Sequence, residues 1–196
     1  MLKQVKYYAE SEGAFLVSAV KTALLEFSEK YIKAYEQAEV ALAIEFDVYG
    51  SSPCITRSSG DTAIWQPTQQ DMYLDFTDLE RGMEVLVHDD FVDYFCCLWS
   101  DHLNANAARG GLQLLMVWNQ DDFIRLQENL IAHLLMKRRL GQRDTLFFAQ
   151  TEDENFILSI LNETGEVVLE PVGQEPREVL AKNLTEFIGA LTPVVV

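Results

Sequence analysis

Length, composition and charge narrow the class of protein before any element is placed. The chain has 196 residues, 48% of them hydrophobic and 11% aromatic, which excludes a disordered chain and allows a buried core. Its 31 acidic and 15 basic side chains give a net charge of −16. The composition therefore argues against a protein that binds nucleic acid or a bare anionic membrane, because either partner requires clustered Lys and Arg. A basic protein surface is the natural complement, although such a charge also serves solubility alone.

The chain begins with a predicted extension over residues 1–13, followed by a helix over residues 14–37. The extension has no apolar core of a signal peptide. No stretch approaches the run of about 18 to 20 apolar residues that a membrane span needs. In the helix, apolar side chains recur every three or four residues and share one face. They are Val20, Leu24, Phe27, Tyr31 and Tyr35.

A β-hairpin is predicted next. Gly50 and Pro53 predict a loop that leads into a strand within residues 48–57. Residues 58–61 then form a turn, and the segment TAIWQP, residues 62–67, returns as a short strand.

The most acidic part of the chain follows the hairpin. Residues 71–101 hold nine acidic side chains and a single cation, Arg81, so they carry half of the net charge. Such a concentration repels itself unless it is solvated or faces a cationic partner. Residues 79–99 fit a helix or a strand, residues 101–111 a loop and residues 112–118 a buried strand. The apolar side of this region consists of Leu86, Phe91, Tyr94, Phe95 and Leu98.

Residues 119–141 predict a well-capped helix. Asn119 suits the N-cap, and Gly141 suits the left-handed residue that ends a helix. Acids at the start and cations at the end complement the helix dipole, and this structural account alone explains the charge asymmetry. The cations are Lys137, Arg138 and Arg139, and the buried stripe is Phe123, Leu126, Leu130 and Leu134, widened by Ile131 and Leu135.

The remaining segments predict three strands and a last helix. The strands cover residues 144–150, 155–162 and 165–172, and the turn NETG, residues 162–165, joins the last two as a hairpin. A helix begins near Pro176, with Leu180, Leu184, Phe187, Ile188 and Leu191 on its buried side. Because regular β–α alternation is missing, we predict a single α+β domain over residues 14–196, a mainly antiparallel sheet flanked by helices.

No pattern in the sequence predicts catalysis, a cofactor or a metal. A phosphate-binding glycine loop and a nucleophile elbow are both missing. His88 and His102 flank the adjacent Cys96 and Cys97, but their spacing matches no zinc motif, and we expect reduced thiols. His133 falls on the helix stripe and is interpreted as a satisfied histidine at the core border. The acid pairs 89–90 and 121–122 alone do not support a metal-dependent hydrolase.

Several segments together resemble the SecY-interacting Syd family, which belongs to the Knr4/Smi1-like, or SUKH, group. They are YGSSPCI (49–55), AIWQP (63–67), LLMVWNQDDFIRLQENLIAHLLMKRRL (114–140), TLFFA (145–149), NETGEV (162–167) and LAKNLTEFI (180–188). The most specific part runs from Trp118 to Leu134. The resemblance covers residues 23–191 and is loose over residues 68–111.

The resemblance implies a non-enzymatic protein that docks on the basic cytoplasmic loops of SecY through an electronegative groove. It implies a peripheral location on the cytoplasmic side of the bacterial inner membrane and sequestration or negative regulation of uncomplexed or abnormal SecY. Cytoplasmic loops of membrane proteins are rich in Lys and Arg, which fits the charge of −16. Our hypothesis for the groove comprises Asp61, Trp65, Trp118, Asp121, Asp122 and Glu128. The alternative is an acidic immunity protein that neutralises a basic toxin.

Overall fold

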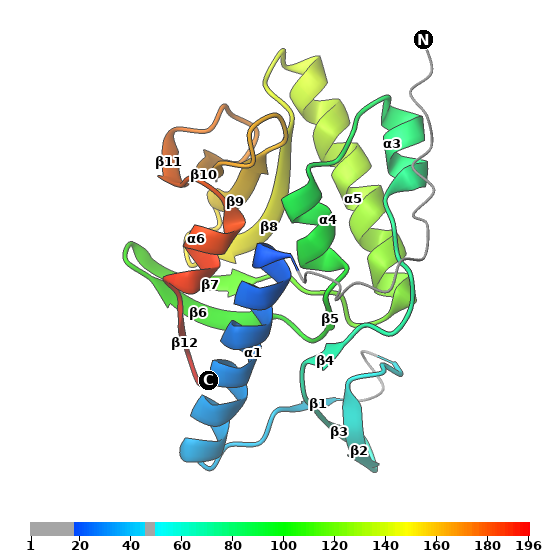
Figure 1. Cartoon of the computed structure of the whole chain (residues 1–196), viewed down its shortest axis with the longest axis vertical. Helices are drawn as coiled ribbons and strands as arrows, with labels where there is room; N and C mark the ends of the chain where they lie inside the picture. Colours follow the sequence, from blue (N-terminus) through cyan, green and yellow to red (C-terminus); the bar gives the residue numbers. More distant parts are fainter. Residues whose placement is uncertain (1–17, 46–49) are drawn as a thin grey trace, which may run out of the picture.

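The computed structural model describes residues 18–45 and 50–196 (Figure 1). The predicted extension over residues 1–13 and its boundary at residue 14 lie outside the described residues. The described helices are α1 (Ala19–Gln37), α3 (Thr77–Met83), α4 (Asp89–Phe95), α5 (Gln120–Arg139) and α6 (Leu184–Gly189). The described strands are β1 (Ala43–Glu45), β2 (Ile55–Ser59), β3 (Thr62–Trp65), β4 (Thr68–Gln69), β5 (Leu98–Trp99), β6 (Leu103–Ala107), β7 (Gly110–Leu114), β8 (Thr145–Thr151), β9 (Phe156–Leu161), β10 (Val167–Pro171), β11 (Glu178–Ala181) and β12 (Thr192–Pro193).

A seven-stranded antiparallel sheet organises the fold, in the order β11-β10-β9-β8-β7-β6-β12. Strands β6 to β11 follow one another as a meander, and β12 returns to pair with β6. The predicted hairpin at residues 162–165 is confirmed, with Gly165 at a φ of 76°. The sheet is curled. Arg109, between β6 and β7, pairs with Glu178 on β11, although three strands separate β11 from β7 in the sheet. The predicted α+β class with a mainly antiparallel sheet is confirmed.

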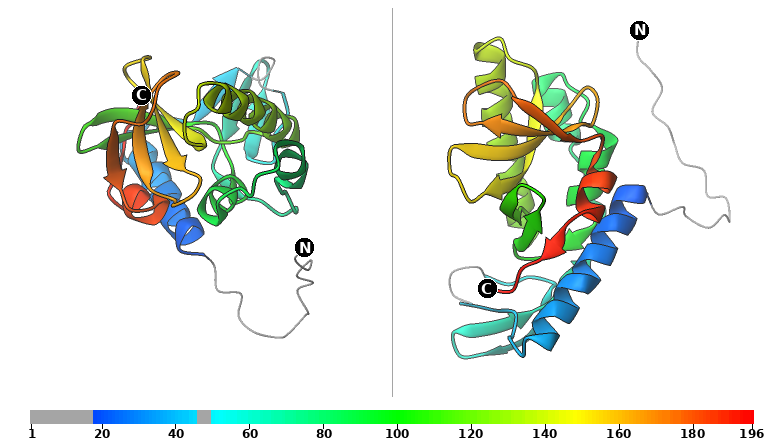
Figure 2. Two further views of the ribbon diagram at one scale, coloured as in Figure 1. Left: turned by 90° about the horizontal axis from the view of Figure 1, so that it is seen from above. Right: turned by 90° about the vertical axis from the view of Figure 1, so that its left-hand side faces the viewer.

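Helices cover both faces of the curled sheet. Phe147 on β8 meets His133 of α5, with ring centroids 5.4 Å apart. The next residue, Phe148, instead meets Tyr94 of α4 and Phe187 of α6, each at 5.7 Å. Successive side chains of a strand point to opposite faces, so α5 lies on one side and α4 and α6 lie on the other. Helix α1 runs beside α6 and β12, as the right-hand view of Figure 2 shows.

A smaller sheet stands apart from the meander and carries the predicted hairpin. Strands β2 and β3 pair antiparallel around the turn at Gly60, and β1 adds to the other side of β3. This sheet occupies the lower right of Figure 1, below the start of α5. A two-stranded ribbon of β4 and β5 lies between it and the helices.

The two long predicted helices are confirmed where the structure describes them. Helix α1 begins after Ser18, whose hydroxyl accepts from the Lys21 amide, and it buries the five predicted apolar side chains. Helix α5 has Asn119 as its N-cap, and Gly141 follows its end with a φ of 67°. Its central stripe is buried, but Leu135, predicted on the same face, is 56% exposed. That leucine lies at the edge of the stripe, where no element of residues 18–45 and 50–196 covers it.

Two of the sequence-based assignments are wrong. Residues 101–111, predicted as a loop, contain β6 and the start of β7. Asn and Gly have low strand propensity, which led to the loop prediction. Leu103 and Ala105, however, alternate into the core, and this packing makes the segment a strand. The helix predicted from Pro176 is instead strand β11 followed by the short α6, because Asn183 caps a helix that begins only at Leu184.

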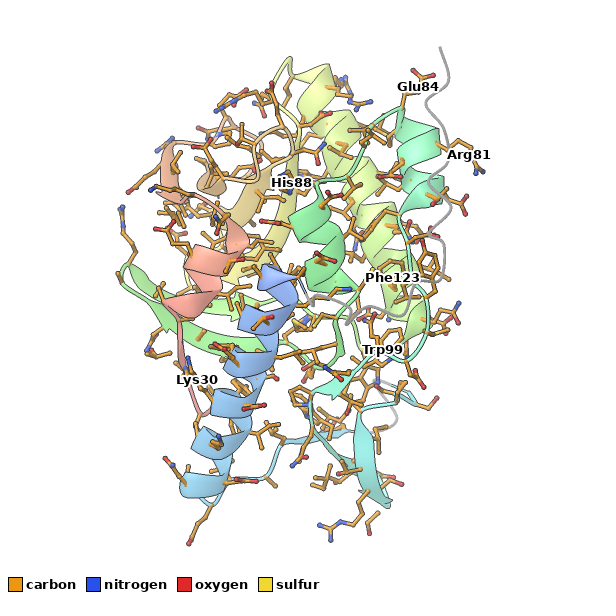
Figure 3. All side chains as sticks on the ribbon, viewed as in Figure 1. Lys30, Arg81, Glu84, His88, Trp99 and Phe123 are labelled. Atoms are coloured by element: carbon orange, nitrogen blue, oxygen red, sulfur yellow. The ribbon has the colours of Figure 1, made fainter. Side chains whose placement is uncertain are left out.

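The acidic region resolves into two short helices, α3 and α4, joined by residues 84–88. Figure 3 shows Arg81 and Glu84 at the outer margin of α3. Phe91, Tyr94 and Phe95 are buried as predicted, whereas Leu86 in the connection is 80% exposed. The predicted strand 112–118 is shorter than expected, since β7 ends at Leu114 and the chain turns toward α5.

Candidate functional site

The most specific segment of the sequence begins at Trp118, where residues 115–119 lead from β7 into α5. Trp118 donates from its indole nitrogen to the Gly50 carbonyl at 3.1 Å and accepts at its own carbonyl from the Ser52 hydroxyl. Asn119 donates to the Ser51 carbonyl at 2.9 Å. Residues 50–52 are thus fastened to the start of α5. Trp99 and Phe123, labelled in Figure 3, mark this junction.

Two predicted site residues are buried inside this junction. The rings of Trp65 on β3 and Trp118 meet edge to face, with centroids 6.2 Å apart. Trp65 is 3% and Trp118 is 4% exposed. The pair joins the small sheet to the start of α5 through apolar contact, and aromatic pairs of this geometry add about 0.5 to 1.5 kcal/mol beyond area burial. Both rings therefore position the surface above them instead of forming it.

Asp122 has a structural role at the first turn of α5. Its amide donates to the Asn119 side chain at 3.0 Å, and its carboxylate accepts from the Trp118 amide at 2.9 Å. The second carboxylate oxygen pairs with Arg125 at 3.0 Å. The first bond caps the helix and satisfies an amide that a helix start leaves open, and the second ties Asp122 to the residue before the N-cap.

Asp121 and Glu128 are exposed and lie on one side of α5. They are seven residues apart, which is close to two full turns. Ile124, which lies between them, is also exposed. The outer side of α5 therefore mixes carboxylates with an apolar side chain, a combination common at the surfaces that proteins use to bind one another.

An additional acid joins this surface that the sequence-based hypothesis did not include. Asp101 lies beside the junction because the Ser100 amide donates to the Val117 carbonyl at 3.0 Å. Burial raises the pKa of Asp101, the His102 amide lowers it, and the negative charge of Asp122 raises it further. Asp101 and Asp122 thus lie near enough to repel each other. The β6–β7 hairpin separates them along the chain, so no sequence spacing indicates their proximity.

Asp61 lies apart from the other acids. It follows Gly60 in the exposed turn between β2 and β3. The structure thus brings Asp101 near Asp122, places Asp121 and Glu128 on the exposed side of the same helix, and leaves Asp61 at the tip of the small sheet. We call Asp101, Asp121, Asp122 and Glu128 the α5 acidic surface.

The histidines and cysteines within the described residues have structural surroundings. His88 caps α4 by accepting from the Asp90 amide, and His102 accepts from the Met116 amide at 3.0 Å. His133 lies 2.8 Å from the Thr145 hydroxyl, which confirms the satisfied histidine. Burial raises the pKa of Cys54 and Cys97 to about 11 and that of Cys96 to about 12, so the three free thiols are protonated at neutral pH.

The NETG turn also serves the architecture. Asn162 accepts from the His88 amide at 3.0 Å and donates to the Leu86 carbonyl at 2.8 Å. A Cβ on Gly165 would lie 2.6 Å from the His88 ring, and the positive φ independently favours glycine. This motif therefore holds the connection between α3 and α4 against the end of the sheet.

Comparison with known proteins agrees with the resemblance seen in the sequence. The family described as Syd protein (SUKH-2) matches residues 21–193. Protein Syd of Alteromonas mediterranea is 46% identical over 170 residues, covering 85% of this chain and 94% of that protein. Protein Syd of Pseudoalteromonas atlantica is 37% identical over 182 residues, covering 91% and 98%. Protein Syd of Yersinia pseudotuberculosis is 39% identical over 176 residues, covering 89% and 96%. The chain belongs to the Syd family.

Proposed function

We propose that this protein binds SecY of the SecYEG translocase through the α5 acidic surface, without catalysing a reaction. The observation that carries the proposal is the proximity of Asp101 to Asp122, next to the exposed Asp121, at the hydrogen-bonded start of α5 on a chain of net charge −16. Syd-family membership supplies the partner, and the Lys- and Arg-rich cytoplasmic loops of a membrane protein supply the complementary charge.

The hydrogen bonds that hold the junction support this role. Asp101 is held in a half-buried position although burial and Asp122 both raise its pKa. Like charges kept close together cost stability, and a cationic partner relieves that cost on binding. The Trp118 amide donates to Asp122 and the Trp118 ring packs against Trp65, so these residues hold the start of α5 in place, while Asp61 is a more distant contact from the small sheet. In this proposal the six residues predicted from the sequence divide into contacting acids and supporting rings.

The protein partner carries the membrane association in this proposal. Among residues 18–45 and 50–196, no helix is long and apolar enough to cross a membrane. A chain of charge −16 is repelled by the anionic lipids of the cytoplasmic leaflet but attracted to basic loops that project from it. We therefore propose a peripheral position on the cytoplasmic side of the bacterial inner membrane. Occupying the loops of uncomplexed or abnormal SecY would sequester it or keep it from its other partners.

Binding to SecYEG in nanodiscs tests the proposal. The double variant Asp121→Lys with Glu128→Lys changes two exposed residues and leaves the Asn119–Asp122 cap intact. We expect its affinity at low salt to fall by about tenfold or more, since opposite charges now face the basic loops. Empty nanodiscs of the same lipid should bind neither protein, and rising salt should weaken binding of the parent protein.

A matched control separates the surface from overall charge. Glu26→Lys with Glu29→Lys makes the same change in net charge on the exposed side of α1. Its affinity should stay within about twofold of the parent. Equal loss in both double variants would refute the α5 acidic surface. No saturable binding of the folded parent to SecYEG at low salt would refute SecY as the partner and favour a soluble basic toxin.

A further inference from the structure

The outer side of α5 exposes large apolar side chains within the part of the chain that the structure describes. Ile124 is 49% exposed and Leu135 is 56% exposed. They are 11 residues apart, which is close to three turns, so they lie in line along the helix. Ile131, between them, is half-buried and packs against the core. A single exposed leucine is ordinary, but two large apolar side chains in line on one helix form an apolar face without a partner element.

The same side of α5 has an acid at its start and a base at its end. Asp121 and Arg139 are exposed and 18 residues apart, which is five full turns, so they too lie in line. Neither forms an ion pair with another side chain of residues 18–45 and 50–196. We define the outer stripe of α5 as six residues, all of them exposed: Asp121, Ile124, Glu128, Ala132, Leu135 and Arg139.

The outer stripe is complementary to a reversed copy of itself. Asp121 and Arg139 lie equally far from the middle of α5, on opposite sides of it. Ile124 and Leu135 do the same to within one residue. In an antiparallel pair of two such helices, the acid of each copy therefore meets the base of the other, and the apolar side chains meet near the centre. Ala132 has the smallest side chain of the stripe and allows close approach there. The two helix dipoles also run in opposite directions, which is favourable.

We propose that two copies of this chain associate through the outer stripe of α5 as a symmetric, antiparallel helix pair. Twofold symmetry uses every contact twice, so two Asp121–Arg139 ion pairs flank two contacts between Ile124 and Leu135. The interface is small, because each copy contributes one helix, and the net charge of −16 on each chain opposes it. We therefore expect a dissociation constant of about 10 to 100 µM at physiological ionic strength.

The helix pair covers part of the α5 acidic surface. Asp121 and Glu128 belong to both surfaces, so a chain within the pair does not present these acids to SecY. This competition rests on the proposed function, whereas the association of two chains does not and is measured without SecYEG. A folded protein that fails to bind SecYEG leaves the helix pair standing, and a monomeric protein leaves the proposed function standing.

Sedimentation equilibrium of the purified full chain tests the association. We expect a monomer–dimer equilibrium, which Ile124→Ser with Leu135→Ser should weaken by about tenfold or more, because the apolar contacts are lost at unchanged net charge. The control is Val172→Ser with Val179→Ser, at two valines of similar exposure outside α5, and it should change association by less than about twofold. Circular dichroism confirms that each variant is folded. A parent protein that stays monomeric up to about 1 mM, or equal weakening in the two double variants, would overturn the proposal.

A charge exchange tests the antiparallel register. Asp121→Arg and Arg139→Asp each set like charges opposite one another, so each should weaken association by about fivefold. Both changes in one chain restore opposite charges and the parent net charge, and association should recover to within about twofold of the parent. Stronger association of Asp121→Arg with weaker association of Arg139→Asp would follow net charge alone and would overturn the proposal. So would a monomeric parent whose SecYEG binding is weakened by Ile124→Ser with Leu135→Ser, since the stripe would then contact SecY.

Discussion

At the scale of single residues, Lys137 has the most demanding surroundings in the described structure. Its side chain is fully buried, and its ammonium donates to Glu170 and to the Gln174 carbonyl, each at 2.9 Å. Glu170 is also fully buried, and its carboxylate lies 3.8 Å from His133. Burial lowers the pKa of His133, and nearby Lys137 lowers it further, whereas Glu170 raises it. Lys137 is therefore the cation on which the buried Glu170 depends.

We predict that Lys137→Met lowers the free energy of unfolding by about 3 to 5 kcal/mol, because it leaves the Glu170 carboxylate buried without its cation. Combining it with Glu170→Leu should recover most of the loss, because the double variant buries neither charge. Urea denaturation at neutral pH measures both effects.

Arg139→Met is the control for that prediction. Arg139 is exposed in the same last turn of α5, so its replacement should change stability by less than about 1 kcal/mol. A loss of similar size for Arg139→Met and Lys137→Met would mean that the helix dipole, and not the buried pair, stabilises this turn.

The sequence predicts the positive charge of the last turn of α5, but it does not predict that the three basic side chains there have different surroundings. Lys137, Arg138 and Arg139 are adjacent cations, and only the fold buries the first of them against Glu170 on β10. The same limit applies to the candidate site. Asp121 and Asp122 follow from the helix start, whereas Asp101 reaches them only through the β6–β7 hairpin. The burial of Trp65 and Trp118 depends likewise on contact between segments far apart in the chain.

At the scale of elements, the start of α5 connects three parts of the fold. Asn119 caps the helix through its side-chain oxygen and holds the loop at Ser51 through its side-chain nitrogen. The residue thereby fixes both the helix axis and the loop that contacts Trp118. Any change at this position should affect stability and the α5 acidic surface together.

We predict that Asn119→Ala lowers the free energy of unfolding by about 1 to 2 kcal/mol, since it removes both a helix cap and a loop contact. It should also weaken SecYEG binding under the proposed function, because Asp121 loses its fixed position. Gln120→Ala, in the exposed first position of α5, should leave both properties nearly unchanged. Thermal unfolding and the nanodisc assay provide the measurements, and a stable Asn119→Ala variant would contradict the prediction.

Elements with strong periodicity could be predicted, and elements with weak intrinsic preference could not. Helices α1 and α5 follow from apolar side chains at helical spacing, and β8 to β10 from β-branched and aromatic runs with a turn between the last two. Strand β6 has Asn, Ala and Leu in place of such residues and becomes a strand because β7 and β12 pair with it. Strand β11 looks helical in sequence, but pairing with β10 overrides that preference.

At the scale of the whole molecule, the net charge of −16 acts on stability and binding in opposite directions. Excess negative charge repels itself in the compact state. The same charge attracts a basic partner. Salt screens both the self-repulsion and the attraction to the partner, with a Debye length of about 8 Å at physiological ionic strength.

We predict that raising sodium chloride from about 20 mM to about 300 mM increases the unfolding temperature of the isolated protein while it weakens SecYEG binding. Screening relieves self-repulsion in the first case and removes attraction in the second. Thermal scans give the slope of the unfolding temperature against salt concentration, and nanodisc titrations in the same buffers give the slope of the SecYEG affinity. Two slopes of the same sign would show that net charge does not govern both properties.

The partners of α1 have a consequence for how the protein folds during synthesis. The helix packs against α6 and β12, and Tyr35 accepts a hydrogen bond from the Val196 amide. Helix α4 covers one part of α1, and the part that faces α6 and β12 stays uncovered until these later elements have formed. This exposure of α1 ends when β12 pairs with β6.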